Sequence, residues 1–150
     1  MNNVVVEYFA EPIKDADLRE FNAKKGISKH MTLWESLALL LAARTWLVRS
    51  PGSAIEVRSD SLGALRMMSK MASKSSEVNK IAQELALDWA LDKYTVRLLR
   101  HTPGIANTVP DILSRIYSPE PKPVPIFLNS AKEVTVPART SAFWLARQYS

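Results

Sequence analysis

The sequence contains no cysteine, and this absence excludes two classes of site. Without thiol groups the chain can form neither a disulfide framework nor a thiolate-bound metal centre. Carboxylate and imidazole groups remain as metal ligands, and the chain has only two histidines. A cysteine-free chain is compatible with an intracellular location, although its composition does not require one.

Long apolar runs are also lacking. No uninterrupted apolar stretch approaches the roughly 18 residues that a membrane-spanning helix needs. The N-terminus has no basic segment followed by an apolar one, so we expect no secretory signal peptide. The sequence also shows no internal repeat, and it predicts no membrane partner.

The composition that is present is typical of one folded domain. The chain has 150 residues, of which 47% are hydrophobic and 23% charged, so it can bury a core and should not be disordered. Its net charge of +5 mildly favours a polyanionic partner such as nucleic acid. Arg66, Lys70 and Lys74 recur every four residues and would form a basic stripe on a helix, which is most simply a solvated face.

The order of the predicted elements indicates an α/β fold. The predicted strands cover residues 4–10, 54–60 and 94–100. The predicted helices cover residues 15–23, 30–48, 61–71 and 77–91, with a short last helix from Pro110. Residues 54–100 form a βαβ crossover, so we expect their two strands to lie parallel within a mixed sheet that has flanking helices.

The composition changes after residue 117. Five of the nine prolines lie between residues 118 and 137, which predicts an extended, Pro-rich tail. We therefore divide the chain into a domain over residues 1–117 and a C-terminal tail over residues 118–150. The apolar residues 143–145 should dock on another surface, and a Pro-rich segment can also serve as a protein-interaction element.

Glu35 is the first candidate for a chemical role. It is the only charged residue between Thr32 and Ala43, on a predicted helix that is apolar nearly all round and therefore buried. An unpaired buried carboxylate costs several kcal/mol, so a metal ion, a cation or a polar network must compensate for it. The alternative is a capping box in which Glu35 and Thr32 satisfy the first turn of the helix.

Two further carboxylates have structural alternatives of their own. Asp60 ends a predicted strand, where α/β sheets bind ligands, but an aspartate there is most simply the N-cap of the following helix. Asp111 follows Pro110 in a first helical turn, which the helix dipole favours without any function. His101 lies on the loop after a strand, as many surface histidines do. If the three carboxylates converge at one sheet edge, their repulsion requires divalent cations, as in two-metal phosphodiester cleavage.

Three segments carry a resemblance to a known family. They are TLWESLALLLAARTW (residues 32–46), IEVRSDSLGAL (residues 55–65) and HTPGIANTVPDILSRI (residues 101–116). The third contains the pattern His-x-Pro-Gly…Asn-x-x-x-Asp-x-Leu-Ser-Arg. Together they resemble the ribonuclease H-like domain of gypsy-type LTR retrotransposon reverse transcriptases, over about residues 4–117.

The resemblance implies a catalytic site. Glu35, Asp60 and Asp111 would bind Mg²⁺ or Mn²⁺ and cleave RNA in RNA:DNA hybrids. His101, which is 111 − 101 = 10 residues before Asp111, would assist proton transfer or product release.

The resemblance also implies contacts with the nucleic acid. Asn107 matches an asparagine that contacts the substrate, and Arg66, Lys70 and Lys74 lie where related enzymes hold the hybrid backbone. The remainder of a reverse transcriptase polyprotein is a further expected partner.

The sequence departs from the family at its first catalytic aspartate. The family's domain opens with a hairpin whose first, central strand carries that residue, whereas residues 4–10 resemble the third strand. Asp15 and Asp17 follow that strand in a predicted surface helix, and Glu7 lies on a strand expected at the far edge of the sheet. The edge left open would be filled by residues 4–10 or by another polypeptide. The chain is therefore either a metal-dependent nuclease or a non-catalytic remnant that binds nucleic acid or protein.

Overall fold

Helices and short strands alternate along the chain. The computed structural model describes residues 5–52, 55–96, 98–104, 107–121 and 123–149. The strands are β1 (Glu7–Tyr8), β2 (Glu56–Ser59), β3 (Leu98–His101) and β4 (Lys132–Glu133). The α-helices are α1 (Asp15–Phe21), α2 (Met31–Trp46), α3 (Leu62–Lys70), α4 (Ser76–Ala90) and α5 (Thr108–Ser114). Short 3₁₀ turns cover Ser28–His30, Leu47–Arg49, Ile126–Ser130 and Leu145–Tyr149. This mixture is compatible with the predicted α/β class.

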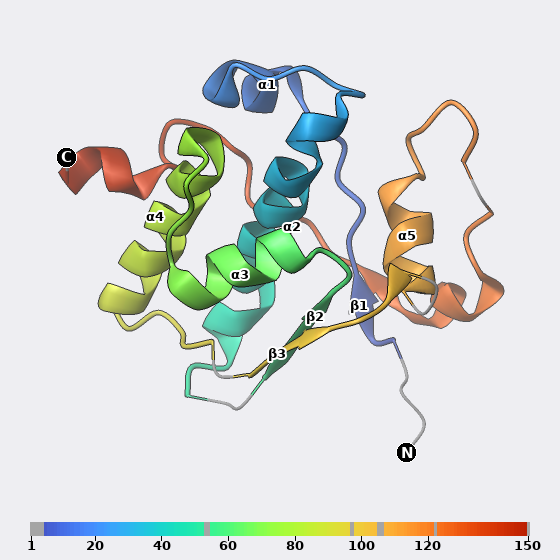
Figure 1. The fold of residues 1–150 in the computed structure, drawn as a ribbon. Helices are drawn as coiled ribbons and strands as arrows, with labels where there is room; N and C mark the ends of the chain where they lie inside the picture. The colour runs from blue at the N-terminus through green and yellow to red at the C-terminus, as the bar shows by residue number, and fades with distance from the viewer. Residues whose placement is uncertain (1–4, 53–54, 97, 105–106, 122, 150) are drawn as a thin grey trace.

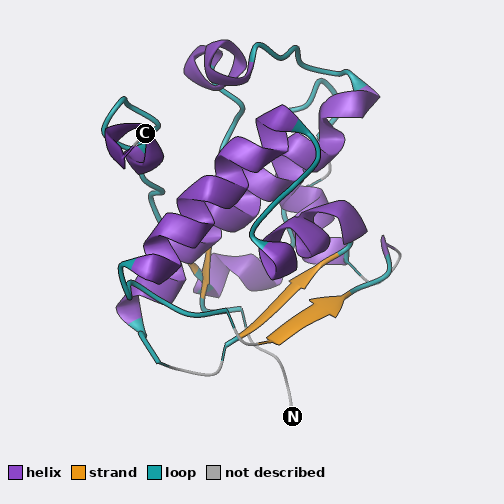
Figure 2. Cartoon of the chain, turned by 60° about the vertical axis from the view of Figure 1, so that its left-hand side comes forward, coloured by secondary structure: helices purple, strands orange, loops and turns teal. Residues whose placement is uncertain are grey.

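The strands form two separate sheets. β2 and β3 are parallel, with Glu56 opposite Leu98 and Ser59 opposite His101, as the predicted βαβ crossover requires. β1 pairs in parallel with β4 instead of joining β2. The predicted single mixed sheet is therefore not found among the described strands, which Figures 1 and 2 show as two pairs. The C-terminal segment is the reason, because it supplies β1 with a partner strand.

Helix α2 runs through the centre of the molecule, with α3 and α4 beside it (Figure 1). Its apolar residues pack with those of α3 and α4 in one core that includes Leu33, Leu37, Leu40, Met67, Met68, Ile81 and Leu85. The first turns of α2 and α3 meet closely, because a Cβ added to Gly63 would lie only 2.9 Å from Cγ2 of Thr32. This contact fixes the start of α3 beside the N-terminal end of α2, where the candidate site lies.

The stretch Ser28–Arg49, which includes α2, is long and apolar enough to cross a membrane by length and composition alone. This is weak evidence for a membrane span, because the buried core helix of a soluble protein passes the same test. Leu37, Leu40 and Ala43 of α2 are buried against the other helices. The predicted absence of a membrane partner remains a prediction.

The C-terminal segment packs on the preceding elements. Val136, Phe143 and Trp144 belong to the same hydrophobic core as α2 and α4. The first part of the predicted tail, after α5, is mostly exposed, whereas Val136, Arg139, Phe143 and Trp144 further along are buried. The change in composition at residue 118 therefore does not mark the end of the packed structure, because apolar residues further along return to the core.

Two buried ion-pair networks fix this segment. Asp17 is fully buried and accepts hydrogen bonds from Nε (2.9 Å) and Nη2 (2.8 Å) of Arg139, which corrects the prediction that Asp17 lies on a surface helix. Nη1 of Arg44 donates to the backbone oxygen of Phe143 (2.7 Å). The Glu84 carboxylate accepts from the backbone N–H groups of Leu145 (3.0 Å) and the next residue (2.9 Å). Buried charged side chains on α2 and α4 thus satisfy the backbone hydrogen-bonding groups of the C-terminal segment.

Candidate functional site

Glu35 lies on α2, near its N-terminal end. The helix begins at Met31, its N-cap residue is His30, and no side chain caps it. Thr32 is therefore inside the helix, and the capping-box alternative for Glu35 is wrong. The Glu35 side chain is half-buried, and no hydrogen bond or ion pair links it to the other described residues. Its charge must be balanced in some other way.

Asp60 follows β2 directly, at the carboxyl end of the strand. Ser61, and not Asp60, is the N-cap of α3, since its Oγ accepts a hydrogen bond from the Ala64 N–H at 3.2 Å. The alternative of Asp60 as a helix cap is therefore wrong. The loop after β3 passes close by: a Cβ on Gly104 would lie 3.8 Å from Oδ2 of Asp60.

His101 stands beside Asp60 at the end of β3. Its Nε2 atom lies 3.2 Å from the backbone oxygen of Asp60, and the side chain is exposed. The parallel pairing of β2 and β3 produces this neighbourhood, because Ser59 and His101 are partners in the sheet register. An exposed imidazole with this placement can exchange protons with solvent and with a ligand bound near Asp60.

Helix α5 positions Asp111. The helix begins at Thr108, two residues before the predicted start, and Asn107 is its half-buried N-cap residue without a side-chain capping bond. Asp111 lies in the first turn, so the helix-dipole interpretation still applies to it. One carboxylate oxygen accepts a hydrogen bond from Nε of Arg115 at 3.1 Å.

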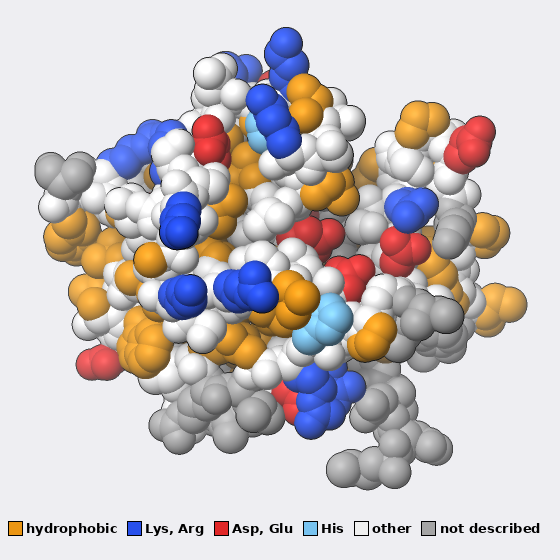
Figure 3. All heavy atoms as spheres, in the orientation of Figure 1, with side chains coloured by type: hydrophobic (Ala, Val, Ile, Leu, Met, Phe, Trp, Pro, Cys, Tyr) orange, Lys and Arg blue, Asp and Glu red, His pale blue; other side chains and the backbone are white. Residues whose placement is uncertain are grey.

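The three carboxylates share one region of the surface. The pKa of Glu35 is raised above its usual value, first by burial and then by the negative charges of Asp60 and Asp111. Figure 3 shows acidic side chains gathered on the face between α2 and α5, with a histidine beside them. Residues far apart in the sequence are therefore brought together, as the sequence predicted.

The comparisons with known proteins add no relative. No family model, curated protein or solved structure matches this chain. The family resemblance therefore rests on the three sequence segments and stays a prediction.

The acidic cluster (Glu35, Asp60 and Asp111) has the right donors for a hard divalent cation, since Mg²⁺ and Mn²⁺ prefer carboxylate oxygens. As the side chains are placed, however, no group of three acidic or histidine residues in the described part of the chain could hold a metal ion. The pairing of Asp111 with Arg115 directs one carboxylate to its own helix. The cluster shows a concentration of negative charge, and side-chain rotation is needed to turn it into a coordination sphere.

None of the acidic residues near the N-terminus joins the cluster. Glu7 accepts hydrogen bonds from Nε1 of Trp46 (2.7 Å) and from Arg49, at the opposite end of α2 from Glu35. Asp17 is held by its buried ion pair, and Asp15 is exposed on α1. These residues therefore make their contacts elsewhere, and the prediction that none of them replaces the family's first catalytic aspartate stays a prediction.

The basic stripe is shorter than predicted. Arg66 and Lys70 are exposed on α3, but Met71 adopts a left-handed conformation (φ 53°) that ends the helix. Lys74 therefore lies in the following loop, outside the helical stripe. Figure 3 shows basic side chains over α3 on the same face as the acidic cluster, where they are accessible to a polyanion.

Sequence reasoning assigned no role to Arg115 or Gly104. Arg115 follows Asp111 by four residues, and this helical spacing is a usable signal for an ion pair. Gly104 has no comparable signal, since its closeness to Asp60 depends on how the loop folds over the end of β2.

Proposed function

We propose that this chain is a ribonuclease H-like domain that binds RNA:DNA hybrids and cleaves their RNA strand with Mg²⁺ or Mn²⁺. The observation that carries the proposal is the gathering of acidic side chains on one face between α2 and α5 (Figure 3). There the pKa of Glu35 is raised, first by burial and then by the charges of Asp60 and Asp111. These residues occupy the positions of metal ligands in the three segments that resemble the family. A half-buried carboxylate beside two like charges favours a bound cation.

Each candidate site residue has a role in this proposal. Glu35, Asp60 and Asp111 would hold the cation, which neutralises charge on the scissile phosphate when it is bound. His101, whose Nε2 lies 3.2 Å from the Asp60 backbone, would move a proton or assist product release. Asn107 would contact the substrate at the start of α5.

The exposed basic side chains of α3 would contact the hybrid backbone. Arg66 and Lys70 lie on the helix that follows Asp60, and Lys74 lies in the next loop. Contacts of this kind hold a nucleic acid in position without reading its sequence. They bring the scissile phosphate toward the acidic cluster, because both groups share one face (Figure 3).

We expect the cleavage to be slow. The family's sites use a further aspartate, for which the described part of this chain offers no replacement. Loss of a group that stabilises the transition state costs about 3–4 kcal/mol, which corresponds to a rate reduction of roughly 10²–10³-fold.

A second candidate function is binding of nucleic acid without cleavage. It is favoured by the ion pair between Asp111 and Arg115 and by the absence, among the described residues, of a ready coordination sphere. The chain would then be a retroelement remnant that retains the binding face. A protein-interaction module ranks below both, since only the Pro-rich stretch after α5 supports it.

The test is cleavage of a labelled RNA:DNA hybrid in Mg²⁺ and in Mn²⁺. We compare the unmodified chain with Asp60→Asn and with the control Asp92→Asn. Asp92 is exposed and has φ 56°, a conformation that asparagine also adopts readily. Cleavage that disappears only in Asp60→Asn supports the nuclease. Hybrid binding that weakens steeply with salt, without cleavage, supports the second candidate. A chain that neither cleaves nor binds the hybrid refutes both candidate functions.

A further inference from the structure

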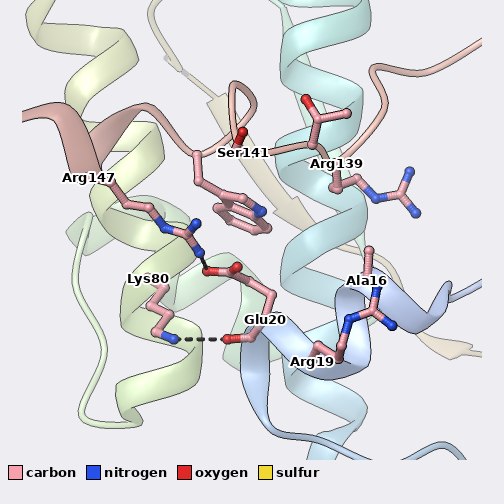
Figure 4. Close-up of a pocket in the computed structure, with 9 residues that line it drawn as sticks. Ala16, Arg19, Glu20, Lys80, Arg139, Ser141 and Arg147 are labelled. Carbon is pink, nitrogen blue, oxygen red and sulfur yellow. Dashed lines mark hydrogen bonds and ion pairs between the residues drawn. The ribbon is translucent and has the colours of Figure 1, made fainter.

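A basic pocket lies where α1, α4 and the C-terminal segment meet (Figure 4). Its volume is about 370 Å³, within the range of small-molecule sites. It is lined by Ala16, Arg19, Glu20, Lys80, Arg139, Thr140, Ser141, Trp144 and Arg147. None of these residues belongs to the acidic cluster or to the predicted hybrid-binding face.

The pocket carries excess positive charge. Its lining has four cationic side chains and one carboxylate. Arg139 is neutralised from outside the pocket, because Asp17 and Glu11 accept hydrogen bonds from its guanidinium (2.8–2.9 Å). Beside the other three cationic side chains, the lining has a single carboxylate, that of Glu20, so the pocket is lined mainly by positive charge.

Several hydrogen-bond donors of the pocket are available to a ligand. Lys80 donates one N–H to the backbone oxygen of Glu20 (3.0 Å), so two ammonium hydrogens remain. In Figure 4, Lys80 and Arg147 both point toward Glu20. Within the described chain, neither the guanidinium group of Arg19 nor the hydroxyl group of Ser141 has a hydrogen-bond partner.

The walls of the pocket are held rigidly. Trp144 is only 4% exposed, and its ring makes edge-to-face contacts with Phe21 (5.3 Å) and Phe143 (4.9 Å). The buried pair of Arg139 and Asp17 joins the C-terminal wall to α1. These contacts fix the elements that carry the donors, so a ligand needs to order only the donor side chains.

We propose that this pocket binds a phosphomonoester dianion. Its cationic lining suits a doubly negative group. The lining also offers ammonium, guanidinium and hydroxyl groups, which donate hydrogen bonds to phosphate oxygens. The phosphate can belong to a small phosphorylated molecule or to the 5′ end of a nucleic-acid strand. The second source rests on the proposed function, whereas binding of phosphate itself does not.

The test is a titration of the ¹⁵N-labelled chain with inorganic phosphate, followed by NMR at constant ionic strength in buffer stripped of divalent cations. We expect saturable shifts at amides of α1, at Lys80 and over residues 140–147, with a dissociation constant on the order of 1 mM. Arg19→Gln and Lys80→Gln should each weaken binding by about fivefold, or about 1 kcal/mol. Lys132→Gln, which removes an exposed charge on β4, should have no effect.

A second titration distinguishes the sources of the phosphate. A short oligonucleotide with a 5′ phosphate should bind more tightly than the same strand without one if the pocket holds strand ends. Equal affinity of the two strands, with saturable binding of free phosphate, assigns the pocket to a small phosphorylated molecule. Shifts that do not saturate, or that survive both Arg19→Gln and Lys80→Gln, overturn the proposal. Because no divalent cation is present, this result is independent of the nuclease test.

Discussion

Arg44 is the residue whose loss should destabilise the fold most clearly. Its side chain is only 9% exposed and joins α2 to α4 and to the C-terminal segment. Nε donates to Asp88 (2.8 Å) and Nη2 to Glu84 (2.7 Å), and these carboxylates have side-chain exposures of 0% and 2%. Nη1 donates to the backbone oxygen of Phe143 (2.7 Å). Arg44 is thus the nearest cation to two buried anions, since Nζ of Lys93 lies farther from Asp88, at 3.8 Å.

The magnitude follows from what the substitution Arg44→Met leaves behind. Removal of one partner from a buried ion pair costs about 3–5 kcal/mol, because the other charge stays buried and unpaired. Here the Tyr94 hydroxyl still donates to Asp88 (2.7 Å), and two backbone N–H groups still donate to Glu84. We therefore expect about 3 kcal/mol, which lowers Tm by roughly 6–12 °C for a domain of this size.

The assay is urea unfolding at pH 7, followed by tryptophan fluorescence. Tyr94→Phe removes one hydrogen bond to Asp88 and should cost about 1 kcal/mol. The triple variant Arg44→Met/Glu84→Gln/Asp88→Asn should recover part of the loss of Arg44→Met, because it leaves no unpaired charge. An Arg44→Met chain within about 1 kcal/mol of the unmodified chain would refute this reasoning.

Three further predictions concern other contacts. Burial alone would raise the pKa of Glu11, but hydrogen bonds, led by the one from Arg139, lower this pKa below its ordinary value of 4.5. The ionised Glu11 carboxylate therefore stabilises the fold above about pH 4.5, and this contribution is lost as the pH falls further. In Glu11→Gln, Tm should fall less steeply in acid than in the unmodified chain. Gly63→Ala should cost about 1–3 kcal/mol in urea unfolding, since its Cβ would lie 2.9 Å from Thr32 Cγ2, and Thr32→Ser should restore part of that loss. The double variant Arg66→Gln/Lys70→Gln should show a shallower salt dependence of hybrid binding, by the amount expected for the loss of about two phosphate contacts. An unchanged slope would mean that the hybrid does not contact α3.

The helices and the crossover could be predicted from local sequence. The apolar spacing of α2, α3 and α4 reports directly on which face is buried. The parallel pairing of β2 and β3 follows from the helices that connect them, because such a connection returns the chain in the same direction. The convergence of Glu35, Asp60 and Asp111 was predicted from the order of these elements together with the family resemblance.

The contacts of the C-terminal segment could not be predicted in this way. β1 and β4 pair over only two residues each, too short a stretch to show an alternating pattern. Asp17 and Arg139 are 139 − 17 = 122 residues apart, and either residue alone is typical of a surface. Helix ends were also missed by a few residues, because Asp60 and Ser61 are both good caps and only the fold selects Ser61.

The central claim is that Glu35, Asp60 and Asp111 bind a divalent cation, and paramagnetic broadening by Mn²⁺ tests it most directly. In ¹⁵N NMR spectra with substoichiometric Mn²⁺, amides near these three residues should broaden first. The selective broadening should vanish in Asp60→Asn and persist in Asp92→Asn. Broadening spread evenly over exposed carboxylates, or centred elsewhere and unchanged by Asp60→Asn, would contradict the account.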